Sequence, residues 1–99
     1  MHNFEEIDAS IRQKILSLTG NNTLIEIFDE SSKHIGHAGS ANYSVSHLRI
    51  HITSDYFCNI KKLERYRILH KTLDQEIKLV HSVTFVIMTF DEAAIYAKP

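Results

Sequence analysis

Apolar residues recur at the three- and four-residue spacing of amphipathic helices in two segments of the chain. Residues 4–18 show this spacing with charged residues between the apolar ones, and residues 60–80 show it over a longer stretch. Each segment therefore predicts a helix that buries one face. The apolar positions are Phe4, Ile7, Ile11, Ile15 and Leu18 in the first segment, and Ile60, Leu63, Tyr66, Leu69, Leu73 and Ile77 in the second.

Residues near the ends of these segments agree with helix boundaries. Asn3 fits the N-cap position, because Glu6 follows three residues later in a capping-box pattern. Gly20 suits the position just beyond the last turn. Near the C-terminus, residues 91–97 predict a short helix with Asp91 as its N-cap.

Three further segments have the composition and spacing of strands. Residues 23–29 are rich in branched and aromatic side chains, and residues 47–54 alternate between apolar and polar positions. Residues 83–90 are apolar on both faces, which favours a covered, central strand.

The predicted element order is helix, strand, strand, helix, strand, helix. Two strands joined by a loop are expected to pair antiparallel, and the third strand, which follows a helical crossover, is expected to lie parallel to one of them. These rules predict an α+β fold, a mixed three-stranded sheet with its helices packed on one face. The 99 residues fit a single domain that spans residues 1–99.

Composition narrows the setting in which such a domain works. The formal net charge of −1 provides no global field for holding nucleic acid or an anionic membrane. The single cysteine, Cys58, excludes an intramolecular disulfide framework, so a reducing compartment is expected. The sequence has neither a signal-peptide pattern at its start nor an apolar run of membrane-spanning length. We therefore expect a cytoplasmic domain without a membrane partner.

The motifs of common enzyme classes are absent from the sequence. It contains no GxSxG nucleophile elbow, no GxxxxGK phosphate loop, no GxGxxG dinucleotide loop and no HExxH metal motif. Cys58 with a nearby histidine base would make a nucleophile. A lone cysteine beside Phe57 in a turn is the simpler interpretation, so we expect no enzymatic activity.

Seven histidines are conspicuous in a chain of this length, and geometry decides which of them can share a metal ion. His47 and His51 are expected on one face of the same strand. Four residues of strand separate them by roughly 13 Å, which is too far for two ligands of one ion.

The remaining candidates lie in and near a long loop. Residues 30–46 have almost no apolar periodicity, and loops of this length inside small domains are usually functional or mobile. His34 and His37 lie in this loop and could chelate a metal together. His81 precedes the third strand, where it can project beside the loop. The alternatives are solvated loop histidines and, for His81, a histidine stabilised by the helix dipole.

Basic residues cluster in the first half of the second predicted helix and on the outer face of the second predicted strand. Cations near a helix N-terminus oppose the helix dipole, so helix stability does not explain them. They suit phosphate or an acidic partner, although a solvated helix face with paired charges is the simpler interpretation. The residues of this candidate partner- and anion-binding surface are Arg49, His51, Lys61, Lys62, Arg65, Arg67 and Lys71.

Several short motifs occur in a set order along most of the chain. They are Asp29-Glu30-Ser31, His34, His37-Ala38-Gly39-Ser40, Ser46-His47-Leu48, Ser54-Asp55-x-Phe57, Arg65-x-Arg67 and Val80-His81. In this order and spacing they resemble the BolA family, over roughly residues 5–92. The resemblance implies a fold similar to a class II KH domain, which agrees with the architecture predicted from periodicity.

The resemblance also implies a function. BolA-like proteins are known as partners of monothiol glutaredoxins, with which they share a 2Fe-2S cluster. This chain would then supply His81 and either His34 or His37, while the glutaredoxin and its glutathione supply thiolates. Such a heterodimer suits iron–sulfur cluster trafficking, assembly or iron sensing. The isolated chain is expected to be monomeric and to hold no cofactor.

A second role described for the family implies an alternative. The chain would then be a nucleic-acid-binding transcription regulator of stress response and cell morphology, with DNA as its partner. Two positions depart from the family pattern. The usual histidine between the two arginines is Tyr66, for which we expect only a packing role, and the usual glycine after the Ser-Asp turn is Asn59, which tolerates a positive φ. Outside the loop at residues 30–46, the sequence has no GxxG of the kind that nucleic-acid-binding KH domains use, which weakens the DNA alternative.

Overall fold

The computed structural model of the chain describes residues 3–34 and 45–97. Its first helix, α1 (Phe4–Thr19), begins where the sequence predicts and ends one residue later. The Oδ1 atom of Asn3 accepts a hydrogen bond from the backbone N–H of Glu6 at 2.9 Å, and this satisfies a donor of the first turn. Gly20 follows the helix with a φ of 90°, which glycine adopts at little cost. Local signals therefore define both ends of α1.

Three strands form one mixed sheet: β1 (Leu24–Asp29), β2 (His47–Thr53) and β3 (Ser82–Met88). Their order is β1-β2-β3, with β1 antiparallel and β3 parallel to β2. Both pairings confirm the prediction from connectivity. The predicted central position of the third strand is wrong, because β2 is central and β3 lies at an edge.

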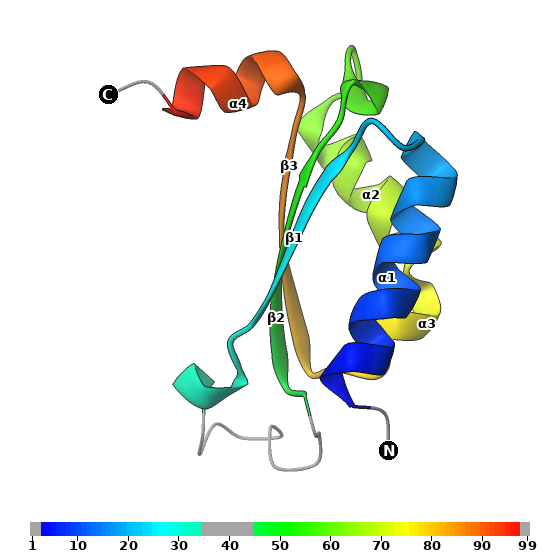
Figure 1. Cartoon of the computed structure of the whole chain (residues 1–99), viewed down its shortest axis with the longest axis vertical. Helices are drawn as coiled ribbons and strands as arrows, with labels where there is room; N and C mark the ends of the chain where they lie inside the picture. Colours follow the sequence, from blue (N-terminus) through cyan, green and yellow to red (C-terminus); the bar gives the residue numbers. More distant parts are fainter. Residues whose placement is uncertain (1–2, 35–44, 98–99) are drawn as a thin grey trace.

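Three helices cover one face of this sheet: α1, α2 (Lys62–Thr72) and α3 (Asp74–Ile77), as Figure 1 shows. This layer confirms the predicted α+β architecture. The last helix, α4 (Phe90–Ala97), does not join the layer but extends from the end of β3 on the other side of the sheet (Figure 1). Short 3-10 helices, η1 (Ser31–His34) and η3 (Asp55–Phe57), follow β1 and β2. None of the helices in residues 3–34 and 45–97 combines the length and the apolar character that spanning a bilayer requires.

The hydrophobic core lies between the sheet and the helices α1 to α3. The alternation along β2 places Leu48, Ile50 and Ile52 in this core, as the sequence predicts, with at most 2% of each exposed. Because a shift of one residue would expose all three, their burial specifies the register of β2. The other hydrophobic residues that are buried in the described part of the chain are Ile7, Ile11, Ile15, Val45, Phe57, Leu69, Leu73, Val80, Phe85 and Ile87.

The two apolar faces of β3 meet different surroundings. Phe85 and Ile87 point toward the helix layer and are buried in the core. Val86 and Met88 point the other way and are half-buried, in a groove that α4 helps to line. The doubly apolar pattern of this strand therefore reflects a core on one face and a groove on the other, and not a central position.

The helix predicted over residues 60–80 is two helices that meet at Leu73. This fully buried residue has a φ of −104° and a ψ of 23°, which ends α2. In α3, the Glu76 carboxylate accepts hydrogen bonds from the Ser10 hydroxyl and, at 2.9 Å, from Nζ of Lys14. Burial by itself would raise the pKa of Glu76, but these hydrogen bonds outweigh it and the pKa is lowered. They hold α3 against α1, a long-range contact that helical periodicity does not encode.

The first half of α2 does not bury the stripe predicted for it. Leu63 and Tyr66 are 63% and 41% exposed, whereas Arg65 is only 5% exposed. The buried guanidinium is accommodated because it donates to the carbonyls of Ile60 and Ile87 and to a carboxylate on α4. Partners from outside the helix therefore reverse the orientation that apolar spacing predicts.

The start of α4 also differs from the prediction, because Thr89 and not Asp91 caps this helix. Oγ1 of Thr89 accepts a hydrogen bond from the N–H of Glu92 at 3.2 Å. In return, Oε1 of Glu92 accepts one from the N–H of Thr89 at 2.8 Å. This reciprocal capping box satisfies two backbone donors and fixes the direction in which α4 leaves β3.

Candidate functional site

The candidate site lies at the end of the sheet where β2 and β3 begin. The parallel register pairs His47 with Ser82, so the two strand starts lie side by side. The backbone N–H groups of His81 and Ser82 both donate to the carbonyl of Ser46, at 3.0 and 2.9 Å. These bonds hold the backbone of His81 at the rim of the sheet.

The rings of His81 and His47 are in contact at this rim. Their centroids are 5.5 Å apart, with an angle of 69° between the ring planes. His81 is exposed, whereas His47 is only 9% exposed and its Nδ1 atom lies 2.9 Å from Oγ of Ser46. The structure therefore presents one imidazole to solvent and supports it with a second that is buried.

Sequence reasoning compared His47 with His51 and missed its contact with His81. The signal was available in the predicted topology. Two parallel neighbours that follow a crossover begin at the same end of a sheet, so residues at their starts come together. Within one strand, His47 and His51 occupy alternate positions of the same face, while pairing across the sheet brings His47 to His81.

Ser31 connects the start of the 30–46 loop to this rim. Its Oγ accepts hydrogen bonds from the backbone N–H of Ser46 at 2.9 Å and of His47 at 3.3 Å. The same hydroxyl donates to the Asp29 carboxylate at 2.5 Å. Since η1 starts at Ser31, the loop leaves the sheet beside the strand that carries His47.

Only one of the two loop histidines lies in a part of the chain that the structure describes. His34 is the last residue of η1, and so lies one short turn from Ser31 at this rim. His37 lies outside the described residues. The choice between these two as a metal ligand stays open.

The donor set fits one part of a shared iron–sulfur cluster. Among the side chains that the structure describes, which do not include that of His34, no three His, Cys, Asp or Glu lie close enough together to hold a metal ion. Cys58 is exposed and follows η3, at the end of β2 opposite the histidine rim. An iron atom of a 2Fe-2S cluster takes two protein ligands, and two imidazoles can replace two thiolates on it. Two histidines near the rim would suffice for one iron, with ligands to the other iron from a partner.

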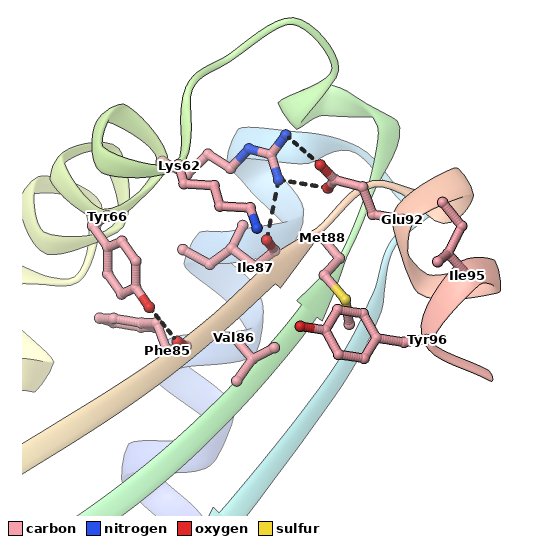
Figure 2. A pocket seen from close by; sticks show the side chains of 10 residues that line it. Lys62, Tyr66, Phe85, Val86, Ile87, Met88, Glu92, Ile95 and Tyr96 are labelled. Carbon is pink, nitrogen blue, oxygen red and sulfur yellow. Dashed lines mark hydrogen bonds and ion pairs between the residues drawn. The ribbon is translucent and has the colours of Figure 1, made fainter. Parts of the chain in front are cut away.

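The predicted partner- and anion-binding surface is not one continuous patch. Arg65 is inside the molecule, where its Nε donates to the carbonyl of Ile60 at 2.8 Å and its Nη1 to that of Ile87 at 3.2 Å. Its guanidinium also pairs with both carboxylate oxygens of Glu92, at 2.6 and 3.3 Å (Figure 2). These partners compensate its charge, so Arg65 stabilises the fold and is not presented to an external partner in this structure.

The other members of that surface are dispersed. Arg49 pairs with Glu30 at 3.2 Å, and Arg67 lies 3.5 Å from a carboxylate oxygen on its own helix. The ring of His51 packs edge-on against Phe28, with centroids 5.5 Å apart. Lys61, Lys62 and Lys71 are exposed on or beside α2.

The two residues that depart from the family pattern have clear roles in the structure. Asn59 has a φ of 65°, which confirms that this position requires the left-handed conformation. Tyr66 does more than pack: its hydroxyl donates to the carbonyl of Phe85 at 2.8 Å, and its ring meets the Phe85 ring edge-on. The expectation of a packing role alone is therefore wrong.

A three-stranded mixed sheet with a helix layer on one face places the chain among small α+β domains. The family model for BolA-like protein matches residues 17–92 of this chain. The chain therefore belongs to the BolA-like protein family. The matched segment starts later than the resemblance drawn from the motifs, and it includes the strands and the residues of the histidine rim.

Solved structures of the family have the same architecture. BolA1 from Arabidopsis thaliana has a TM-score of 0.72 and 20% identity, over 93% of this chain and 98% of that one. BolA1 from Mus musculus has a TM-score of 0.71 and 26% identity, over 94% of this chain and 72% of that one. The BolA domain of SufE1 from Arabidopsis thaliana has a TM-score of 0.68 and 28% identity, over 85% and 92%. No curated protein matches the sequence.

Proposed function

We propose that this chain is a non-enzymatic partner of a monothiol glutaredoxin, with which it forms a heterodimer and co-ligates a bridging 2Fe-2S cluster. The cluster is the cargo of this complex, for transfer to recipients, for cluster assembly or for iron sensing. Membership of the BolA-like family supports the proposal. The observation that carries it is the exposed His81 ring, which is held at the sheet rim against His47 beside the loop that contains His34 and His37.

In this proposal each residue at the rim has a distinct task. His81 and one loop histidine donate imidazole nitrogens to one iron, while the glutaredoxin and glutathione supply thiolates to the other. His47 supports the His81 ring at a centroid distance of 5.5 Å, and Ser31 anchors the loop to the rim. Imidazole ligation raises the reduction potential of such clusters relative to thiolate ligation. Since a protonated imidazole cannot bind metal, cluster binding is expected to weaken on acidification.

The proposal assigns the chain no catalysed reaction. We also propose a cytoplasmic location, because a thiol-ligated partner and an exposed Cys58 both suit a reducing compartment.

Co-purification with a monothiol glutaredoxin tests the proposal. The heterodimer should be coloured, with a visible absorption spectrum that differs from that of the glutaredoxin homodimer. His81→Ala should abolish this difference, while His70→Ala, which removes an exposed histidine on α2, should preserve it. Separate His34→Ala and His37→Ala variants identify the second ligand. An unchanged spectrum for His81→Ala would show that His81 is not a ligand.

The DNA-binding alternative receives less support from the described residues. Of the basic residues predicted to form its surface, Arg65 is buried, and Arg49 and Arg67 form ion pairs within the chain. Binding through the remaining lysines would rely on phosphate contacts and would weaken steeply with salt. A mobility-shift assay at low salt separates the two functions, since a glutaredoxin partner needs no affinity for DNA.

A further inference from the structure

A groove crosses the edge of β3 at the end of the molecule remote from the histidine rim. It lies between α2 and α4 and has a volume of about 310 Å³, at the lower end of the range for ligand pockets. Such a volume accommodates one or two large side chains. Figure 2 shows Tyr66 on one side, Val86 and Met88 along the floor, and Ile95 and Tyr96 on the other side.

Hydrogen bonds between the elements fix the walls of this groove. Tyr66 on α2 donates to the carbonyl of Phe85, and Arg65 donates to the carbonyl of Ile87 and to Glu92 on α4. The two carbonyls belong to the free edge of β3, where an added strand would form its backbone bonds. Because Tyr66 and Arg65 already donate hydrogen bonds to these carbonyls, a bound peptide has to contact the groove through its side chains and not by adding a strand to the sheet.

The side chains of α4 give the groove its apolar character. No residue of this helix is buried, and Ile95 and Tyr96 are 70% and 79% exposed. An eight-residue helix is not stable by itself in water, so α4 depends on its anchor at Glu92. Two large side chains held in this way above Val86 and Met88 form an apolar surface that the described chain does not cover.

Charge at the rim of the groove is positive. Lys62 lines the groove, is exposed, and has no ion-pair partner among the residues that the structure describes. Lys61 precedes it at the start of α2, where the helix dipole adds partial positive charge. Arg65 and Glu92 compensate one another, so the net positive charge of the lining residues comes from Lys62. Carboxylates next to an apolar side chain would complement this surface.

We propose that the groove between α2 and α4 docks an acidic amphipathic peptide segment of a partner protein. One large apolar side chain of that segment enters between Tyr66, Met88 and Tyr96, and a neighbouring carboxylate pairs with Lys62. An apolar floor gives a polyphosphate chain little to bind, which favours a peptide over nucleic acid. The β3 residues that line this groove, Phe85 to Met88, lie four to seven residues along the strand from His81, which is roughly 13 to 23 Å, so the groove is separate from the proposed cluster site.

Titration of the isotope-labelled full chain with short peptides tests the proposal. One set of probes carries a single Trp, Phe or Leu flanked by Asp and Glu, and a matched set replaces the acidic residues with Lys. Members of the acidic set should shift the backbone resonances of Val86, Met88, Ile95 and Tyr96 saturably. Lys62→Glu should weaken this binding about tenfold, the equivalent of one 1.4 kcal/mol charge contact. Ile95→Ser should weaken it by at least as much.

Matched variants on the same helices separate the groove from general surface effects. Lys71→Glu makes the same charge change on α2 at an exposed lysine that does not line the groove, and Leu63→Ser removes an exposed apolar side chain outside it. Both should bind the acidic peptides as the unmodified chain does, and so should His81→Ala.

Four results would overturn the proposal. These are the absence of groove shifts with every acidic peptide, equal binding of acidic and basic sets, an equal loss in Lys71→Glu, and stronger groove binding of a single-stranded DNA oligonucleotide than of any peptide. Failure of the glutaredoxin experiment leaves this test unaffected, because it does not involve His81.

Discussion

Replacing Glu92 with glutamine should destabilise the protein at neutral pH and have little effect in strong acid. The substitution preserves the size of the side chain and an oxygen for the N–H of Thr89, but it removes the charge that compensates the buried Arg65. The hydrogen bond from Arg65 is the main cause that lowers the pKa of Glu92 from its usual 4.5 to about 2. The backbone hydrogen bond from Thr89 adds to this effect, while desolvation opposes it.

The size of the effect follows from that pKa. At 1.36 kcal/mol per pKa unit, the depression corresponds to about 3 kcal/mol of stability. The Glu92 side chain is 36% exposed, so screening by solvent reduces the expected loss to about 1.5 kcal/mol. Because the pKa is depressed in the folded state, this stabilisation is fully present above pH 4.5 and is lost as the pH falls toward 2.

Urea denaturation of both chains at several pH values measures this difference. At pH 7 the free energy of unfolding of Glu92→Gln should be lower by about 1.5 kcal/mol, and the two values should converge near pH 2. Glu64→Gln is a matched control, since Glu64 pairs with Arg67 between side chains that are 53% and 67% exposed. It should change stability by less than about 0.5 kcal/mol. A Glu92→Gln deficit that is the same at every pH would refute the reasoning.

Three further substitutions probe the fold. Phe57→Ala removes a side chain with no exposed surface and should lower the free energy of unfolding by about 4 kcal/mol in chemical denaturation. Tyr56→Ala, whose side chain is 41% exposed, should cause a much smaller loss, and equal losses would contradict this expectation. Tyr66→Phe should cost about 1 kcal/mol, because the hydrogen bond to the Phe85 carbonyl is lost, and unchanged thermal unfolding would show that this bond contributes nothing. Asn59→Ala should cost about 1 kcal/mol at its φ of 65°, while Asn59→Gly should be neutral or stabilising; the reverse order would contradict a left-handed requirement.

Much of the architecture could be predicted because its signals are local. The cap at Asn3 and the glycine at position 20 bound α1 as expected. Connectivity alone implied that β1 and β2 pair antiparallel and that β3 lies parallel to one of them, which in the structure is β2. In the site, the position of His81 at the sheet rim followed from its place before the third strand. Its contact with His47 was not predicted, because the spacing of His47 was compared only with that of His51 on the same strand.

The errors concern residues whose partners are distant in the sequence. Apolar spacing placed Tyr66 on the inner face of α2, but Arg65 is there, since Glu92 and the Ile87 carbonyl satisfy its guanidinium. The break at Leu73 accompanies the contact of Glu76 with α1. Neither the contact between Arg65 and Glu92 nor that between Glu76 and α1 can be predicted from helical periodicity.

The sequence by itself determined the types and order of the elements, apart from the break at Leu73, and the side of β2 that is buried. Periods of 2 and 3.6 residues follow from backbone geometry, so they can be read without a partner. Only the tertiary structure decided that His81 meets His47, that Arg65 is compensated by Glu92, and that β3 lies at an edge beside a groove. These depend on which strands pair and how helices pack upon them, interactions between residues far apart in the chain. Both the proposed cluster site and the proposed peptide groove depend on contacts of this long-range kind.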